Sequence, residues 1–455
     1  MNPDLTILKL LSVGVFSVTW LLSRQRSRDL KISDLFILML MAVYLPYFLF
    51  NRQATSIWNP LSFSEAVMWR GEVGFMTVLA VGSAVFLIKI ALGRFWMGGP
   101  AIPVQSIEMQ LINKTSVAAF LVAALIFGPL MLFPEFRDFR GKTLEFIIGN
   151  VSGSLYDQYR NQVFTGTFLM DGVLGRLRFV AFPILFLVSI SGCVVARRYL
   201  FGLIAALVFF VALPMSFAKL SFAYYCGYLG FYLLYVRFGR ISFVYFAIGV
   251  PVIMALAIAG LSVVYFAQYH GAMIFEDTTQ NLIGMACNRI WGESYSILLR
   301  YFTVYPDQLS FTGGSGINLF AKLSGIEPRM PDIEVAVAML GTNPGSNPGV
   351  FFLGGYAAFG YPGLVAFAFL GFGILFLLDA VGERMRTQYV RSIYLAIMSM
   401  NVLFFLQVAL QTALLTYGVL VVPGVLFAAD HLLSRYDRRD RLQDFKNANQ
   451  ADAAP

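Results

Sequence analysis

Residues 350–378 read VFFLGGYAAFGYPGLVAFAFLGFGILFLL, a run of apolar and small residues without a single charge. A membrane-spanning α-helix needs about 20 consecutive, mostly apolar residues, so this run is long enough to cross a bilayer. Segments of the same kind recur along the chain. The whole sequence is 58% hydrophobic and 13% charged, whereas soluble domains carry about 25% charged residues. The sequence therefore predicts an all-α, polytopic membrane protein.

We expect about 11 transmembrane helices. They cover residues 5–22, 32–50, 67–92, 115–133, 173–196, 199–213, 220–236, 241–267, 350–378, 392–410 and 413–429. The N-terminus lacks the basic region and the small-residue cleavage site of a signal peptide, so the first span is expected to stay in the protein. The three cysteines form no disulfide framework, and we expect three buried free thiols.

The positions of Lys and Arg predict the orientation in the membrane. More than half of the 33 Lys and Arg residues fall in one alternate set of short connections and in the C-terminal tail. Short loops rich in these residues stay in the cytoplasm. The net charge of +8 is therefore mostly a topology signal. A nucleic-acid role is not expected, because these basic residues are divided among membrane-edge loops and form no single patch.

This orientation leaves two large loops outside the cytoplasm. We predict one integral membrane domain over residues 1–430, with a first extracytoplasmic loop at 134–172 and a large one at 269–347. Residues 431–455 are predicted to be a cytoplasmic tail, basic at first and then partly disordered. The large loop interrupts an otherwise apolar chain with many charges, which indicates that it carries the function.

Several kinds of chemistry have no motif in this chain. There is no phosphate-binding Walker A loop, no dinucleotide glycine fingerprint, no HExxH and no paired CxxC. The only two histidines, His270 and His431, fall on opposite membrane faces and cannot share a metal ion. We therefore expect neither a metal nor a nucleotide cofactor.

The large loop contains a segment with helical periodicity. Apolar residues from Asn281 to Tyr305 recur at helical spacing, which predicts an amphipathic helix against the membrane surface or against the spans. Arg289, Glu293 and Arg300 are four and seven residues apart on it and share one face. A second helix is predicted over Ile317–Leu323.

Arginine and lysine side chains outside the cytoplasm are candidates for binding an anion. Guanidinium groups match phosphate oxygens with two hydrogen bonds, so an arginine pair facing a membrane-surface cavity suits a diphosphate. The candidates are Arg160, Arg176, Arg178, Lys219, Arg289 and Arg300. Lys219 lies between two apolar spans, where a charge costs about 2.5–3.5 kcal/mol and is usually paired or functional.

Each candidate also has a structural interpretation. Lys219 can extend to the membrane interface. Three of the arginines can instead form ion pairs within the loops. These arginines are Arg160, Arg289 and Arg300, and the possible partners are Asp157, Glu293 or Asp307. The glycines that open the span at 350–378 either allow close helix packing or leave room for a lipid or sugar chain; they are Gly354, Gly355, Gly360 and Gly363.

Four segments carry a resemblance to a known family. They are SLYDQYRNQVF at 154–164, LPMSFAKLSFAYY at 213–225, NRIWGESYSILL at 288–299 and NPGSNPGVFFLGGYAAFGYPG at 343–363. In their order and spacing, over residues 154–418, the chain resembles the Wzy-type O-antigen polymerases of Gram-negative bacteria, in particular the Pseudomonas-type enzymes. The resemblance implies a GT-C-like glycosyltransferase with up to about 14 spans in the bacterial inner membrane.

The resemblance also implies an activity. Such enzymes transfer a growing glycan from undecaprenyl diphosphate to a lipid-linked repeat unit on the periplasmic face, with a chain-length regulator as an expected partner. By position it implies catalytic roles for Arg160 and Arg289. We add Asp157 and Glu293 to the catalytic group, and Arg300, Lys219, Arg176 and Arg178 as diphosphate-binding residues. His270 and Glu276 are further candidates for the base.

Two alternatives stay open at this point. An O-antigen ligase uses the same donor but transfers the glycan to lipid A-core. A transporter of polysaccharide or lipid-linked oligosaccharide predicts charged residues in the middle of its spans and internal two-fold similarity.

Overall fold

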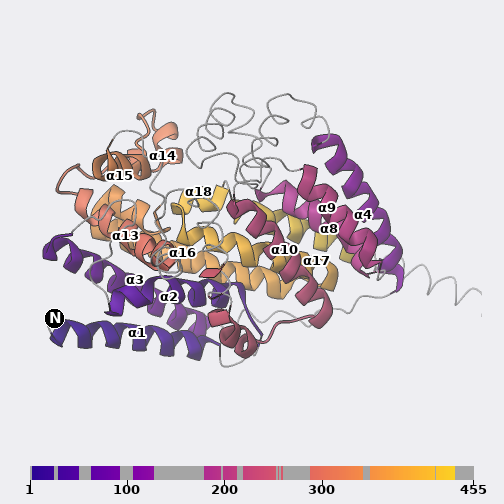
Figure 1. Ribbon diagram of the computed structural model, residues 1–455, viewed down its shortest axis with the longest axis horizontal. Helices are drawn as coiled ribbons and strands as arrows, with labels where there is room; N and C mark the ends of the chain where they lie inside the picture. Colours follow the sequence, from indigo (N-terminus) through magenta and orange to yellow (C-terminus); the bar gives the residue numbers. More distant parts are fainter. Residues whose placement is uncertain are drawn as a thin grey trace, which may run out of the picture. The chain divides into compact units, whose positions relative to one another are not determined.

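The computed structural model describes residues 3–24, 29–50, 63–92, 106–127, 179–195, 198–212, 219–252, 255, 258–259, 287–341, 349–415 and 417–435. These residues are predominantly helical (Figure 1). Among them no β-strand forms, and the extended backbone contributes one isolated bridge between Asp29 and Ser242.

Among the described residues, five helical segments are long and apolar enough to cross a membrane. They are α1 (Pro3–Ser23), α2 (Ile32–Phe50), α3 (Glu65–Leu92), α16 (Leu353–Arg384), and α17 (Gln388–Asn401) continued by the 3-10 turn η6 (Val402–Leu406). The protein is therefore an all-α membrane protein, which confirms the predicted fold class at this level. The predicted count of about 11 spans is not tested by the described residues.

The other named α-helices are not among these five segments. They are α4 (Ser106–Phe127), α8 (Ala181–Val195), α9 (Tyr199–Ala212), α10 (Lys219–Phe238), α13 (Glu293–Val304), α14 (Asn318–Leu323), α15 (Pro331–Leu340) and α18 (Leu410–Leu415). A π-helical turn, η4 (Asn288–Gly292), precedes α13, and a 3-10 turn, η5 (Gly313–Gly316), precedes α14. Residues 243–252 and 421–435 are also helical.

The predicted last span, over 413–429, is wrong as a single helix. Helix α18 ends at Leu415, and regular helix resumes only at residue 421. Gly418 lies between them with φ +73°, and a Cβ added to it would lie 2.9 Å from Val180 Cγ2. Hydropathy does not change through this turn, so composition alone predicts one continuous span.

Contacts within the chain divide it into two compact units. The first comprises Met1–Trp96, Ile241–Leu377 and Val402–Leu414, and the second Met97–Arg240, Leu378–Asn401 and Leu415–Pro455. The sequence predicted one integral domain with two loops. The loop boundaries at 134, 172, 269 and 347 lie outside the described residues, so that division stays a prediction.

In the first unit, α1 packs against α2 and α3 (Figure 1). Its core is a cluster of buried phenylalanines whose neighbouring ring centroids are 5.6 to 6.5 Å apart: Phe16, Phe36, Phe86, Phe351, Phe372 and Phe405. Gly82 of α3 makes room for it, because a Cβ there would lie 2.6 Å from Phe16 and 3.0 Å from Phe372.

Helix α16 is sharply kinked near its start. Phe359 and Gly360 leave helical geometry, and Gly360 adopts φ +66°, which glycine tolerates best. The kink brings two backbones together, since a Cβ on Gly355 would lie 2.3 Å from the carbonyl oxygen of Gly363. For Gly355 and Gly363 the structure supports close packing, because backbone fills the space that a side chain would take.

In the second unit, α8 packs against α4, α9 and α10, and α17 packs against α10. Buried hydroxyls join these helices: Ser116 Oγ lies 3.1 Å from Ser191 Oγ, and Ser191 Oγ lies 2.9 Å from Tyr389 Oη. Hydroxyl contacts of this kind are typical between helices in a membrane. The cysteines Cys193, Cys226 and Cys287 are free thiols, but Cys226 is exposed and the other two are half-buried, so their predicted burial is wrong.

Candidate functional site

The predicted loop helix exists, and it packs against membrane-spanning helices. In the described residues, which in this segment start at Cys287, it comprises the π-helical turn η4 followed by α13, which contacts α2 and α3. Its apolar side chains at helical spacing, Tyr295, Leu298, Leu299 and Phe302, are fully buried. Of the two locations that the sequence left open, membrane surface or spans, the structure shows the second.

Two glycines of α3 receive this helix. A Cβ added to Gly71 would lie 2.6 Å from Leu299 Cδ2, and one added to Gly74 would lie 2.4 Å from Phe302 Cζ. Small residues on a membrane helix allow a neighbouring helix to approach closely. Residues Gly71 and Gly74 therefore set the position of α13 and of the charged residues that it carries.

Arg300 and Glu293 form an ion pair on α13. Their spacing of seven residues places both side chains on one face of the helix. Arg300 Nη1 lies 3.2 Å from Glu293 Oε1, and Arg300 Nη2 donates to Glu293 Oε2 at 3.5 Å. Arg300 is only 1% exposed and Glu293 is 16% exposed. A buried guanidinium needs such a carboxylate, because burial without an opposite charge is strongly unfavourable.

The backbone of Arg289 lies in the π-helical turn η4, and its side chain is outside the described part of the structure. The indole of Trp291 in this turn donates to the carbonyl oxygen of Ala42 in α2 at 2.8 Å. A Cβ on Gly292 would lie 3.2 Å from Tyr47 Oη. The turn is thus anchored on α2, and π-helical turns are frequent at functional sites.

The described part of the structure does not show whether the remaining predicted site residues lie close together. Lys219 is the first residue of α10, but its side chain is outside the described set. The same holds for the whole of Arg160, Asp157, Arg176, Arg178, His270 and Glu276. Lys219 belongs to the second unit and Arg300 to the first. Their predicted convergence on one diphosphate therefore stays a prediction.

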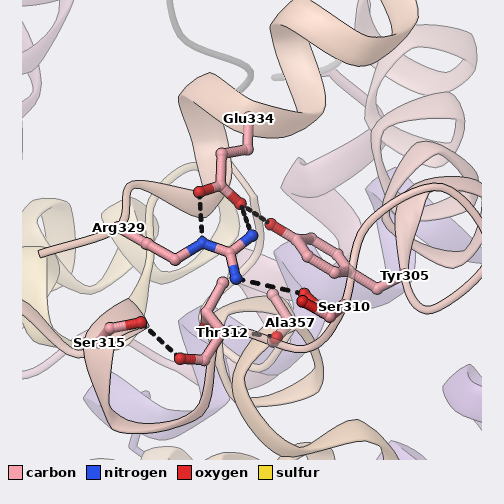
Figure 2. A network of polar contacts seen from close by, with 7 residues as sticks. All are labelled: Tyr305, Ser310, Thr312, Ser315, Arg329, Glu334 and Ala357. Atoms are coloured by element: carbon pink, nitrogen blue, oxygen red, sulfur yellow. Dashed lines mark hydrogen bonds and ion pairs between the residues drawn. The ribbon is translucent and has the colours of Figure 1, made fainter.

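A second arginine pair fixes the segment that follows α13 (Figure 2). Arg329 donates to both carboxylate oxygens of Glu334, from Nε and from Nη2, each at 2.7 Å. Tyr305, directly after α13, donates its hydroxyl to Glu334 Oε2 at 2.6 Å. Arg329 also donates to the carbonyl oxygen of Ser310 at 3.4 Å. The network holds the first turn of α15 against the end of α13.

The network also sets the ionisation of its members. Burial would raise the pKa of Glu334, but hydrogen bonds from Arg329 and Tyr305 outweigh it and lower that pKa. Burial and the hydrogen bond to Glu334 raise the pKa of Tyr305. Glu334 thus remains a carboxylate and Tyr305 remains protonated.

Sequence analysis did not assign a role to Arg329 and Glu334, and it did not predict α15. A signal was present, since Pro331 begins α15 and Asp332 and Glu334 occupy its first turn. Proline at the first position and acidic residues in the first turn are typical of a helix N-terminus. The second predicted helix, over Ile317–Leu323, is confirmed as α14.

Among the described side chains, the partner of Asp307 is an arginine that we did not consider from sequence; Arg160 and the side chain of Arg289 lie outside them. Asp307 binds Arg70 of α3, whose Nη1 donates to Asp307 Oδ1 at 3.1 Å and whose Nη2 contacts Oδ2. This hydrogen bonding lowers the pKa of Asp307. The pair joins α3 to the turn after α13 although its members are far apart in sequence.

Lys9 and Glu72 form a fully buried ion pair that sequence analysis missed. Lys9 of α1 contacts Glu72 of α3 and donates to the carbonyl oxygen of Phe48 in α2 at 3.1 Å. Lys9 is 1% exposed and Glu72 is completely buried. The signal was available, because each charge interrupts a predicted span and charges within spans are usually paired or functional.

Comparisons of this chain with protein-family models, with curated proteins and with solved structures gave no match.

Proposed function

We propose that this protein is a Wzy-type O-antigen polymerase. It transfers a growing glycan from undecaprenyl diphosphate to a lipid-linked repeat unit, without a metal or a nucleotide. The proposal includes a bacterial inner-membrane location, a site that faces the periplasm, and a GT-C-like fold with about 11, or up to about 14, spans.

The observation that carries this proposal is the difference between the two arginine pairs. Arg329 and Glu334 meet in a tight fork with two 2.7 Å hydrogen bonds. Arg300 and Glu293 are 3.2 and 3.5 Å apart, longer than the roughly 2.7–2.9 Å of a strong charge-assisted hydrogen bond. Glu293 contacts Arg300 at these longer distances, on a helix that packs against the spans, which suits exchange of this one carboxylate for a diphosphate.

The exchange supplies both groups that the transfer needs. The acceptor hydroxyl attacks the anomeric carbon of the donor sugar, and the bond from that carbon to the diphosphate oxygen breaks. The leaving diphosphate takes the electron pair and is stabilised by Arg300. Glu293, released from Arg300, accepts the proton of the acceptor hydroxyl. Because the lipid diphosphate is already a good leaving group, no further energy source enters the reaction.

The other residues of the proposed site keep their sequence-based roles. Arg289, four residues before Glu293, is proposed to contact the same diphosphate. Arg160, Lys219, Arg176 and Arg178 complete the proposed cationic group, and Asp157, His270 and Glu276 remain alternatives for the base.

The test is a reaction with the purified protein in lipid nanodiscs. The substrate is an undecaprenyl-diphosphate-linked repeat unit, with a chelator present and no nucleotide. We expect a ladder of longer glycans and release of undecaprenyl diphosphate. If the ladder is absent and the glycan instead moves only to added lipid A-core, the protein is a ligase. Lipopolysaccharide from a deletion strain gives the same distinction, with core plus one repeat for a polymerase and bare core for a ligase.

One observation favours a second candidate, a transporter of lipid-linked oligosaccharide. Lys9 and Glu72 place two charges inside α1 and α3, and charged pairs inside spans are common along transport paths. Movement of a fluorescent lipid-linked oligosaccharide across proteoliposomes tests it. Transport that requires Lys9 and Glu72, without any ladder of products, would replace the polymerase proposal.

A further inference from the structure

The segment after α13 exposes an unusually apolar face. Phe320 and Leu323 of α14, Ile326 and Met330 between the helices, and Ile333 and Val337 of α15 are 43 to 80% exposed. We call these six residues the α14–α15 face. They lie outside the five helices that are long enough to span a membrane. Contiguous exposed apolar surface of this kind marks an interaction site on most proteins.

The face is a feature of the helices and not of isolated residues. Met330, Ile333 and Val337 are three and seven residues apart and form one stripe along α15. The opposite side of α15 is also apolar, because Val335 and Ala336 are completely buried. A helix at the boundary between a protein core and water normally carries polar residues outward. Helix α15 does not, so its outer side is expected to be covered.

The segment cannot turn this face inward. Arg329 and Glu334 tie the start of α15 to Tyr305 (Figure 2). The backbone amide of Arg329 donates to the carbonyl oxygen of Ser315 at 3.0 Å, and that of Ile326 donates to Ala321 at 2.9 Å. The inward positions are already filled, so an outside partner must cover the α14–α15 face.

The face adjoins a membrane-spanning helix. The amide of Thr312 donates to the carbonyl oxygen of Ala357 in α16 at 2.9 Å. Phe311, 39% exposed, lies against Gly360 of α16, where an added Cβ would be 3.1 Å from its Cζ. Phe359, next to it on α16, is 48% exposed. Phe320 of α14 lies against the turn that follows Thr312, because a Cβ on Gly314 would be 2.3 Å from its Cε1, so exposed apolar side chains extend from α16 through Phe311 to α14.

We infer that the α14–α15 face is embedded in the interfacial region of the bilayer that α16 crosses. The continuity with α16 identifies lipid as the partner, since exposed apolar side chains of a span face lipid. Lys322, exposed on α14, is placed to reach the headgroups. The segment then acts as a membrane-surface anchor that holds α13, with Arg300 and Glu293, at the membrane. The inference does not depend on the reaction that the protein catalyses.

Spin-label accessibility in nanodiscs tests the inference on the full chain. In a background with Cys193→Ser, Cys226→Ser and Cys287→Ser, single cysteines are placed at Leu323 and Ile333 and labelled with a nitroxide. Leu11→Cys on α1, where Leu11 is 59% exposed, is the lipid reference, and Glu327→Cys is the water reference. Collision rates are measured with oxygen, which enters lipid, and with a water-soluble nickel chelate.

We expect the labels at Leu323 and Ile333 to resemble the label at Leu11, with oxygen collisions at least several-fold above nickel collisions. Labels that resemble Glu327, with nickel dominating, would overturn the inference. Labels shielded from both reagents, or broadened by a label on a second copy, would overturn it too, because they would show that protein covers the face. Quenching of a fluorophore at Ile326→Cys by brominated lipids gives an independent readout, with strong quenching expected and none contradicting the inference.

Discussion

Arg300 Nη1 lies 3.2 Å from Glu293 Oε1, on a helix whose apolar side chains are buried against α2 and α3. The pair combines an almost fully buried guanidinium with a carboxylate that still reaches solvent, since Glu293 is 16% exposed. This asymmetry gives the two residues different expected roles, with Arg300 held in place and Glu293 able to exchange a proton.

Replacing Glu293 with Gln tests the proton-accepting role. Glutamine keeps the size of the side chain and a hydrogen bond to Arg300 but cannot take a proton from an acceptor hydroxyl. We expect the initial rate of glycan polymerisation to fall by about 10²–10⁴-fold, the usual contribution of a general base. Substrate binding should remain, as measured with a fluorescent lipid-linked repeat unit. Wild-type rates from Glu293→Gln would assign the base to another residue.

Loss of one member of the Lys9–Glu72 ion pair should destabilise the protein strongly, whereas replacement of both members by apolar residues should not. Lys9→Met leaves the Glu72 carboxylate buried without its cation, and we expect it to destabilise the protein by about 3–5 kcal/mol. The double variant Lys9→Met/Glu72→Leu should recover most of this loss. Reversible unfolding in mixed micelles measures both. A double variant as unstable as Lys9→Met alone would mean that the two side chains do not balance each other.

The packing of α13 against α3 should be sensitive to the size of the side chain at position 74. Gly74→Leu drives a side chain into Phe302, and overpacking of this kind costs about 1–3 kcal/mol. The control is Gly14→Leu on α1, because nothing lies within 4 Å of a Cβ added to Gly14. We expect a lower melting temperature for Gly74→Leu only, measured by fluorescence in detergent. Equal melting temperatures would show that α13 does not pack on α3 at this glycine.

The network around Glu334 predicts a pH dependence. Its pKa is lowered from an ordinary value of 4.5, so the stabilisation is fully present above about pH 4.5 and is lost as the pH falls through the lowered value. Burial raises the pKa of Asp332, so protonation of Asp332 stabilises the folded state as the pH falls, opposite to the effect of Glu334. The informative quantity is therefore the difference between wild type and Glu334→Gln.

Limited proteolysis between pH 7 and pH 3.5, with an acid-tolerant protease, measures this difference. Wild type should become easier to cleave between Ser324 and Met330 as the pH falls, whereas Glu334→Gln should be cleaved readily at every pH. A wild-type profile without any change down to pH 3.5 would contradict the lowered pKa.

Long apolar segments could be predicted from sequence because a span depends mainly on its own composition. The predicted span at 32–50 coincides with α2, and α14 lies within the predicted segment 317–323. The kink at Gly360 and the break at Gly418 could not be predicted in this way. Hydropathy continues through both, and the side chains that lie against these two glycines, Phe311 and Val180, come from other parts of the chain.

Ion pairs were harder to predict because most join distant segments. Arg300 with Glu293 was among the considered possibilities, since helical spacing alone relates the two. Arg70 with Asp307 and Lys9 with Glu72 require that α3 lie beside α13 and α1. Sequence spacing carries no information on that arrangement, although the charges inside two spans were a visible signal.

Binding of the lipid diphosphate by Arg300 can be tested by comparing two lysine variants. Arg300→Lys and Arg329→Lys each replace a guanidinium by an ammonium in the same helical region, and only the first lies in the proposed site. In nanodiscs with an undecaprenyl-diphosphate-linked repeat unit, we expect Arg300→Lys to slow chain extension at least about 100-fold, a loss typical for a removed charge-stabilising group. Arg329→Lys should stay within a few-fold of wild type. Equal activity of Arg300→Lys and wild type, with both variants folded, would show that Arg300 does not stabilise the leaving diphosphate.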